Sequence, residues 1–159
     1  MAVFLWAVEV NDAVPEEMVR RMWENLPPQR RSRLERQKNA EKALEAGASG
    51  IVVSNHGGRV LDHCPATAEV LPDIVDAVGG KMTIFVDGAI RSGMDMFKAL
   101  ALGADAVLIG RPFVTTVYGG GEEGVQLYVQ KLKAELADTM RMCGAHSLAD
   151  IDRSMLYGF

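Results

Sequence analysis

The chain has 159 residues, of which 48% are hydrophobic and 24% are charged, and its formal net charge is −4. This length and composition predict one globular core and exclude two ordinary domains. Neither a basic field nor an apolar run of transmembrane length is present, so we expect no nucleic-acid partner, no membrane partner and a cytoplasmic location.

The first part of the chain, residues 1–39, lacks the repeated helix–strand pattern that is found in the rest. We predict a strand over residues 3–10 and a helix over about 15–25, before two consecutive prolines interrupt the chain. The basic segment that follows, residues 30–38, is interpreted as the solvated face of a helix, with a phosphate-binding or acyl-carrier-binding surface as the less favoured alternative. We therefore predict a segment of uncertain origin up to residue 39 and a second unit over residues 40–159.

An internal repeat organises this second unit. Residues 42–53 and 98–109 share a helix end, a Gly-Ala turn and an apolar strand. Between the two copies, residues 68–78 have helical spacing and residues 83–86 have the composition of a strand. The resulting order of alternating helices and strands predicts parallel strands joined by right-handed crossovers, as in a barrel or a doubly wound sheet.

After the last strand, residues 124–142 carry apolar side chains at near-helical spacing and predict an amphipathic closing helix. Ser147 is expected to cap a short helix over residues 148–151. Cys64 and Cys143 lie far apart in the sequence and lack metal-ligand spacing, so we predict free thiols and no metal site.

Polar, glycine-rich stretches follow three consecutive predicted strands. They are Ser54-Asn55-His56-Gly57-Gly58-Arg59, Asp87-Gly88-Ala89-Ile90-Arg91 and Gly110-Arg111-Pro112. Because ligands of parallel α/β folds bind at the carboxyl ends of the strands, these stretches are expected to share one rim. Glycines let backbone amides approach an anion, and the guanidinium groups of Arg91 and Arg111 match phosphate geometry. The pattern predicts a phosphate site between the last two strands.

His56 and Arg59 lie three residues apart after the first of these strands. A neutral imidazole accepts a proton near physiological pH, while a guanidinium stays charged and binds a carboxylate, so the pair indicates catalysis on an acidic substrate. Asp87 has two interpretations that the sequence leaves open: a contact to ligand hydroxyl groups, or a structural partner for a neighbouring arginine. Asp62 is interpreted as an exposed turn residue, with an orienting contact to Arg59 as the alternative.

Residues from about 40 to 157 resemble the carboxyl-terminal part of the FMN-dependent α-hydroxy-acid dehydrogenases and oxidases, the glycolate, lactate and mandelate group. The Ser-Asn-His-Gly-Gly-Arg run, the Asp-Gly-x-Ile-Arg stretch and the run from Lys98 to Pro112 carry the resemblance. Phosphate loops of glycine and arginine also fit the barrels of inosine-monophosphate dehydrogenase and type-two isopentenyl diphosphate isomerase. The Ser-Asn-His-Gly-Gly-Arg run distinguishes the α-hydroxy-acid group from these two. The resemblance implies a partial TIM (βα)8 barrel, comprising the last three βα units and a closing helix, preceded by an unrelated strand–helix segment.

This resemblance implies FMN-dependent oxidation of a small 2-hydroxy acid to the 2-oxo acid. His56 would be the catalytic base and Arg59 would bind the substrate carboxylate. The residues implied to bind FMN are Ser54, which would face the flavin ring, and Asp87, Gly88, Ala89, Arg91, Gly110 and Arg111, which would hold the ribityl chain and the phosphate. The family has a glycine where this chain has Ala89, so a methyl group crowds the approach there.

The family's first five strands supply most of the flavin-ring contacts, and none of these groups can be assigned in this sequence. We therefore expect a truncated module with weak or no FMN binding and no turnover by the chain alone. We also expect self-association through open sheet edges, unless the first segment adds a strand at one edge. The alternative is a noncatalytic phosphate-binding or flavin-binding fragment that completes another barrel half. Residues 1–39 faintly resemble the amino-terminal strand and helix of Sfp-type phosphopantetheinyl transferases, and a transferase remnant is the least favoured hypothesis.

Overall fold

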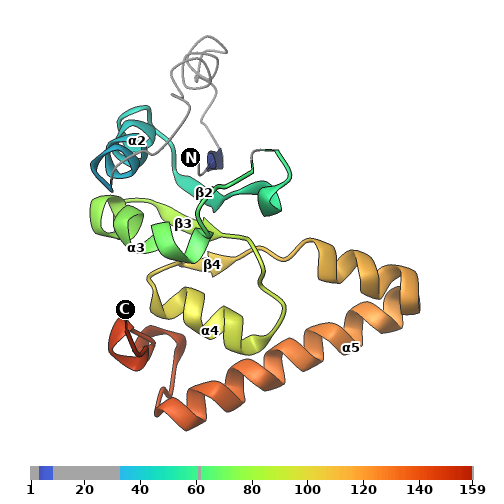
Figure 1. Cartoon of the computed structure of the whole chain (residues 1–159). Helices are drawn as coiled ribbons and strands as arrows, with labels where there is room; N and C mark the ends of the chain where they lie inside the picture. The colour runs from blue at the N-terminus through green and yellow to red at the C-terminus, as the bar shows by residue number, and fades with distance from the viewer. Residues whose placement is uncertain (1–3, 9–32, 61, 159) are drawn as a thin grey trace.

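The structure is a computed structural model that describes residues 4–8, 33–60 and 62–158 (Figure 1). The strands are β1 (Phe4–Val8), β2 (Gly50–Ser54), β3 (Thr83–Val86) and β4 (Ala106–Val107). The helices are α2 (Arg33–Glu45), α3 (Thr67–Val78), α4 (Gly93–Ala101) and α5 (Arg111–Cys143). Short 3-10 turns are η1 (His56–Gly58), η2 (Leu148–Asp150) and η3 (Arg153–Met155).

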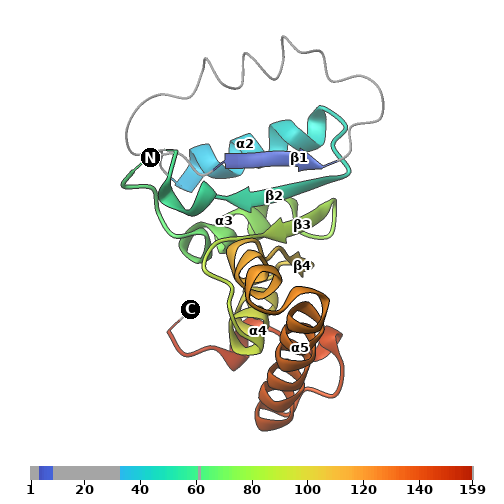
Figure 2. The ribbon, with the colours of Figure 1, turned by 90° about the vertical axis from the view of Figure 1, so that its right-hand side faces the viewer.

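The strands form one sheet in the order β1-β2-β3-β4. β2, β3 and β4 are parallel, which confirms the prediction from the repeats. β2 is buried along its whole length, as its unalternating apolar run predicted. β1 pairs antiparallel with β2, from Phe4 opposite Ser54 to Val8 opposite Gly50, and so covers one edge of the parallel strands (Figure 2).

A buried apolar cluster joins the sheet to the helices α2, α3 and α4. Alternate residues of a strand share one face, and Ile51, Val53, Ile84 and Val86 are the members of the cluster that come from the strands. The helices contribute Ala40, Ala43, Val70, Leu71, Ile74, Ala77, Val78 and Ala99. Full burial of a Val, Leu or Ile side chain stabilises a fold by about 1.5–3 kcal/mol, so this cluster fixes the strands and therefore the rim at their carboxyl ends.

The closing helix differs from its predicted range of 124–142. It begins at Arg111, and Gly121, with φ 53° and ψ −136°, interrupts it. The chain folds back at this glycine, so that α5 has two arms (Figure 1). Pro112 lies in the first turn, where its missing N–H removes no helical hydrogen bond.

The last strand is shorter than predicted. We expected an apolar strand through residue 109, but β4 ends at Val107. Its neighbour β3 ends at Val86, directly opposite Val107, so further pairing along the sheet has no partner strand there. Leu108 continues the contact through a single bond from its N–H to the Val86 carbonyl (2.8 Å).

The boundary predicted near Asn39 falls inside α2 and stays a prediction. Because α2 begins at Arg33, the expected helix that runs into the first repeat is confirmed for its described part. The helix predicted over 15–25 lies outside the described residues. The short helix predicted after Ser147 is present as η2, and the Ser147 N–H donates to the Asp150 carboxylate (2.7 Å).

Candidate active site

The candidate site begins at a tight turn where β2 ends. Ser54, the last residue of β2, is 1% exposed, and its Oγ accepts a hydrogen bond from the His56 backbone N–H (3.1 Å). Asn55 Oδ1 accepts from the Gly57 N–H (2.9 Å), while Asn55 Nδ2 donates to the Pro65 carbonyl (3.2 Å). These bonds make an Asx-type turn, and they fix the backbone at His56 before any ligand binds.

The backbone of His56 is itself unusual. Its φ is 53°, and Gly57 and Gly58 follow with φ of 64° and 72°. A left-handed conformation costs a non-glycine residue about 1–2 kcal/mol, and such strain gathers at functional sites. His56 is half-buried and Arg59 is exposed, so the structure brings the two predicted residues onto one turn at the strand end.

The loop after this turn carries the remaining sequence candidates. Asp62 accepts from the His63 N–H (2.8 Å), and its carboxylate lies 3.6 Å from a ring nitrogen of His63, both side chains being exposed. This favours the interpretation of Asp62 as a turn residue over an orienting contact to Arg59. Cys64 is a free thiol, as predicted. In the described part of the chain, no group of three or more His, Cys, Asp or Glu is placed to hold a metal ion.

The end of β3 supplies a buried acceptor, the Asp87 carboxylate. The Asp87 N–H donates to the Val53 carbonyl of β2 (3.1 Å), and its carbonyl accepts from Thr67 Oγ1 (2.6 Å). Its side-chain Oδ1 is buried and has no hydrogen-bond partner among the described residues. An unsatisfied buried acceptor is unfavourable by about 1–3 kcal/mol or more. A hydroxyl group of a bound ligand would satisfy this oxygen.

The surroundings of the Asp87 carboxylate distinguish its two interpretations. No ion pair joins its carboxylate to Arg91 or Arg111, both of which are described residues. The geometry therefore does not support Asp87 as a structural partner for an arginine. Thr67, which sequence reasoning missed, holds the backbone at Asp87 from the first turn of α3, twenty positions away.

Gly88 and Ala89 turn the chain sharply after this carboxylate, with φ of 100° and 59°. A Cβ on Gly88 would lie 2.8 Å from Thr67 Oγ1, so a glycine is needed there for space as well as for conformation. Ala89 adopts the left-handed conformation despite its methyl group. The departure from the family's glycine therefore has a cost in backbone strain.

Arg111 reaches from the end of β4 to the end of β2. Gly110 caps the amino terminus of α5 and Arg111 is its first residue. A Cβ built on Gly57 would collide with Arg111 Nη2 and lie 3.2 Å from its Cζ, so the guanidinium rests directly against the Gly57 backbone. This contact joins the first and third strand ends, as the shared rim predicted.

Arg91 lies on the loop between β3 and α4, and its side chain is exposed. Its backbone N–H donates to Asp95 (3.1 Å) and its carbonyl accepts from Tyr128 (2.9 Å). The contacts that place Arg91 therefore come from α4 and α5 and not from the strand ends. Sequence reasoning missed Tyr128, which belongs to no motif.

Comparisons with known proteins cover most of the chain. Residues 34–158 match the FMN-dependent dehydrogenase family. The chain is 49% identical over 121 residues to an L-lactate oxidase from Roseobacter sp. (strain GAI101), covering 76% of this chain and 33% of that protein. It is 50% identical over 116 residues to a peroxisomal (S)-2-hydroxyacid oxidase from Arabidopsis thaliana, covering 73% and 32%.

Solved structures of mandelate oxidase are also similar. A complex with benzoyl-formic acid has a TM-score of 0.71 and 46% sequence identity over 74% of this chain and 35% of that one. A mutant with a monooxide FMN adduct matches with the same TM-score and identity, covering 74% and 37%. No helix in the described residues is long and apolar enough to cross a membrane.

The chain spans about a third of the length of the curated relatives it matches. Its three parallel strands and crossover helices are consistent with part of the barrel of those structures. The matched range includes every site residue predicted from the sequence. The buried Asp87 acceptor, the adjacent glycine turn and the arginine at the rim fit a phosphorylated polyol such as the ribityl phosphate of FMN. The chain therefore belongs to the FMN-dependent dehydrogenase family, whose cofactor is FMN.

Proposed function

We propose that this chain carries the base, the substrate anchor and the phosphate receptors of a site that oxidises a small 2-hydroxy acid to the 2-oxo acid with FMN. The observation that supports this proposal most is the contact of Arg111 with Gly57, which joins a phosphate receptor to the turn of His56 and Arg59. In this proposal β2, β3 and β4 are the last three strands of a (βα)8 barrel. When bound, FMN would accept the two electrons and the hydrogen that leave the hydroxyl carbon, as a hydride equivalent.

The cofactor would be held along the rim, by Ser54, Asp87, Gly88, Ala89, Arg91, Gly110 and Arg111. The buried Oδ1 of Asp87 would accept a hydrogen bond from a ribityl hydroxyl group, which would remove the cost of its unsatisfied state. The guanidinium groups of Arg91 and Arg111 bind the phosphate oxygens, since a planar fork of donors matches phosphate geometry.

On the substrate side, His56 takes the hydroxyl proton at a ring nitrogen and Arg59 binds the carboxylate. Bidentate hydrogen bonds from the guanidinium orient the carboxylate and thereby the neighbouring hydroxyl carbon. The hydrogen bond from the His56 N–H to the buried Ser54 Oγ holds the base at a fixed place on the rim. Such positioning matters for the reaction rate, because a displacement of a catalytic group by about 1 Å lowers the rate on the order of a hundredfold.

Two measurements on the full chain test this function. Flavin fluorescence during FMN titration gives the Kd, and loss of flavin absorbance under anaerobic conditions reports reduction by L-lactate, glycolate or mandelate. The sequence leaves weak FMN binding and no FMN binding as two outcomes, and this proposal requires the first, so FMN is supplied in large excess over the Kd. We expect one slow reduction of the bound flavin.

Two histidine variants compare the proposed base with an exposed histidine on the same loop. Both His56 and His63 have positive φ, at 53° and 58°, and asparagine tolerates that conformation well. His56→Asn is expected to keep FMN affinity and to abolish flavin reduction. His63→Asn, at a side chain that is 92% exposed, is expected to change neither. Equal reduction rates in the two variants, or no FMN bound by the wild-type chain, would contradict the proposal.

A further inference from the structure

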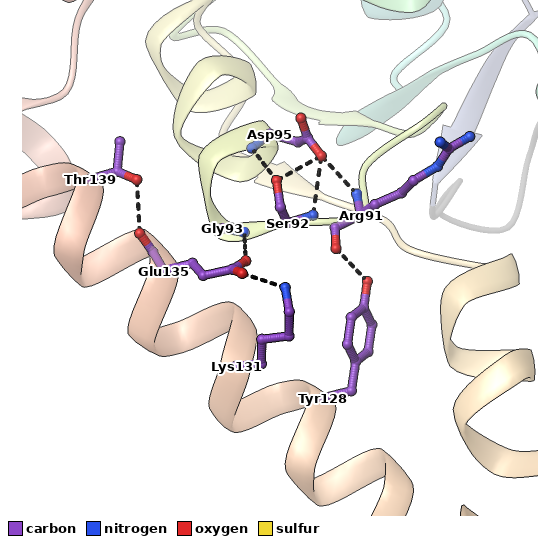
Figure 3. Close-up of polar contacts among 8 residues, drawn as sticks. All are labelled: Arg91, Ser92, Gly93, Asp95, Tyr128, Lys131, Glu135 and Thr139. Carbon is purple, nitrogen blue, oxygen red and sulfur yellow. Dashed lines mark hydrogen bonds and ion pairs between the residues drawn. The ribbon is translucent and has the colours of Figure 1, made fainter. Parts of the chain in front are cut away.

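Side chains of α5 hold the loop that carries Arg91 (Figure 3). Tyr128 Oη donates to the Arg91 carbonyl (2.9 Å), and Glu135 Oε2 accepts from the Gly93 N–H (2.9 Å). Both contacts span a long stretch of sequence, 37 and 42 positions. The two side chains therefore connect the loop to a helix that is distant in the chain.

Asp95 holds the same loop from the side of α4. Its Oδ2 accepts from the backbone N–H groups of Arg91 and Ser92 (3.1 Å each) and from Ser92 Oγ (2.8 Å). Ser92 Oγ in turn accepts from the Asp95 N–H (3.1 Å), which completes a capping box at the start of α4. Arg91 is thus fixed at its N–H by Asp95 and at its carbonyl by Tyr128.

Tyr128 also contacts the other arm of α5. Its ring packs edge-on against Phe113, with 5.0 Å between the ring centroids. Phe113 lies two residues after Arg111, and its N–H donates to the Gly110 carbonyl (3.0 Å). One tyrosine therefore contacts the backbone of Arg91 and the side chain of Phe113, which lies two residues after Arg111.

Glu135 is suited to hold a backbone N–H because it stays ionised. Its side chain pairs with Lys131 one turn earlier on α5, and the hydrogen bonds from Lys131 and from the Gly93 N–H lower the pKa of Glu135 below its ordinary value. The two helices meet at Gly93, where an added Cβ would lie 2.5 Å from the Leu132 carbonyl. The loop is therefore tied to α5 by packing and by charge.

We propose that Tyr128 and Glu135 are positioning residues for phosphate binding, because they fix the backbone from which Arg91 reaches the anion. The Arg91 guanidinium extends away from the second arm of α5, which carries both of these residues (Figure 3). No ion pair engages it among the described residues, so it is available to a phosphate. The inference rests on the proposed function in one respect: the anion is taken to be the phosphate of FMN.

Parallel titrations with FMN and with riboflavin, which lacks the phosphate, separate positioning from general folding. Tyr128→Phe removes one hydroxyl and keeps the ring on Phe113, and Glu135→Gln keeps the shape of the side chain and removes its charge. We expect Tyr128→Phe, which loses its hydrogen bond, to weaken FMN binding about tenfold. We expect a smaller loss in Glu135→Gln, because the amide oxygen still accepts from the Gly93 N–H but without a charge. Both variants should leave riboflavin binding unchanged.

The matched control is Gln126→Ala. Gln126 lies on the same helix and bonds to Glu122 (3.2 Å), away from the loop. This variant is expected to leave the affinity for both flavins unchanged. Unchanged FMN affinity in Tyr128→Phe and Glu135→Gln, or an equal loss of FMN and riboflavin affinity, would overturn the inference.

A second measurement does not depend on flavin. Inorganic phosphate is titrated into the full chain while NMR follows the backbone amides of residues 91–93 and the Arg91 Nε–H. We expect saturable shifts in the wild type and a Kd raised about tenfold in Tyr128→Phe. Phosphate binding without FMN binding would refute the proposed function and leave this inference standing. Absence of saturable shifts in the wild type, or equal phosphate affinity in Tyr128→Phe, would refute the inference.

Discussion

Ala89 adopts a left-handed backbone conformation, with φ 59°, on the turn that follows Asp87. Glycine adopts this φ without a penalty from Cβ, although it also gives the unfolded chain more freedom. We expect Ala89→Gly to raise the free energy of unfolding by about 0.5–1 kcal/mol, as measured by urea denaturation.

The same substitution at Ala134 is the control for this prediction. Ala134 is exposed in the regular second arm of α5, where glycine lowers stability by about 1 kcal/mol. The two variants should therefore move the urea midpoint in opposite directions. A loss of stability in Ala89→Gly would show that strain at this turn is not the dominant effect of the methyl group.

The residues that follow a strand directly could be placed from the sequence, and those that arrive from elsewhere could not. Ser54 and His56 are fixed by local turn bonds that their own neighbours make. Thr67 and Tyr128 reach the backbone of Asp87 and Arg91 from 20 and 37 positions away, and neither belongs to a sequence motif. Such contacts depend on how α3 and α5 pack, which a single sequence does not specify.

At the level of elements, Gly93 sets how closely α4 approaches α5. An added Cβ would collide with the Leu136 backbone N and lie 2.6 Å from Glu135 Cβ. Overpacking of this kind typically costs about 1–3 kcal/mol, so we expect Gly93→Ala to lower the free energy of unfolding by that amount. Gly120→Ala has no atom within 4 Å of the added Cβ and replaces a glycine inside α5, so it should raise stability by about 0.5–1 kcal/mol. Thermal denaturation of both variants checks the contrast, and an equal loss in the two would contradict it.

The contact between α5 and the Arg91 loop should weaken in acid. Hydrogen bonds from Lys131 and from the Gly93 N–H lower the pKa of Glu135 in the folded protein below its ordinary value of 4.5. The stability that this group contributes is therefore fully present above pH 4.5 and is lost as the pH falls through the lower folded pKa. Urea denaturation across the acid range should show a shallower pH dependence for Glu135→Gln than for the wild type. Identical pH slopes would contradict this prediction.

The stability of Glu135→Gln should still fall somewhat in acid. Backbone N–H groups of Ser147 and His146 lower the pKa of Asp150, and the Ser154 hydroxyl and N–H lower the pKa of Asp152. Both carboxylates cap the short turns of the tail and titrate with the same sign as Glu135. Complete loss of the pH dependence in Glu135→Gln would mean that these caps contribute nothing to stability.

The extent of α5 shows why element boundaries were harder to predict than element types. Residues 119–121 are three consecutive glycines, which are typical of a break, and the apolar spacing predicted a helix only after them, over residues 124–142. In the structure Gly119 and Gly120 remain helical and the turn occurs at Gly121. Gly124 then lies so close to the first arm that its Cβ would be 2.5 Å from the Thr116 carbonyl. Close packing of the two arms accounts for helix formation on both sides of the break.

At the scale of the whole molecule, the two edges of the sheet differ. The strands of a (βα)8 barrel are all parallel, whereas β1 is antiparallel to β2. β1 therefore occupies the edge of β2 at which a further parallel strand would pair. At the opposite edge, β4 is two residues long and pairs with β3 in the described part of the chain. A strand this short offers few free backbone groups to another chain.

This asymmetry leads to a prediction about self-association. Removal of residues 1–8 would uncover five residues of β2, which are buried in the intact fold, together with their backbone N–H and carbonyl groups. Exposed apolar edge strands pair readily with other chains. The shortened protein should therefore form oligomers or aggregates at concentrations at which the full chain does not. Light scattering over a concentration series measures this difference. Removal of residues 1–3 leaves β1 complete and should have no effect. Equal particle sizes for the two shortened proteins would mean that β1 does not protect β2.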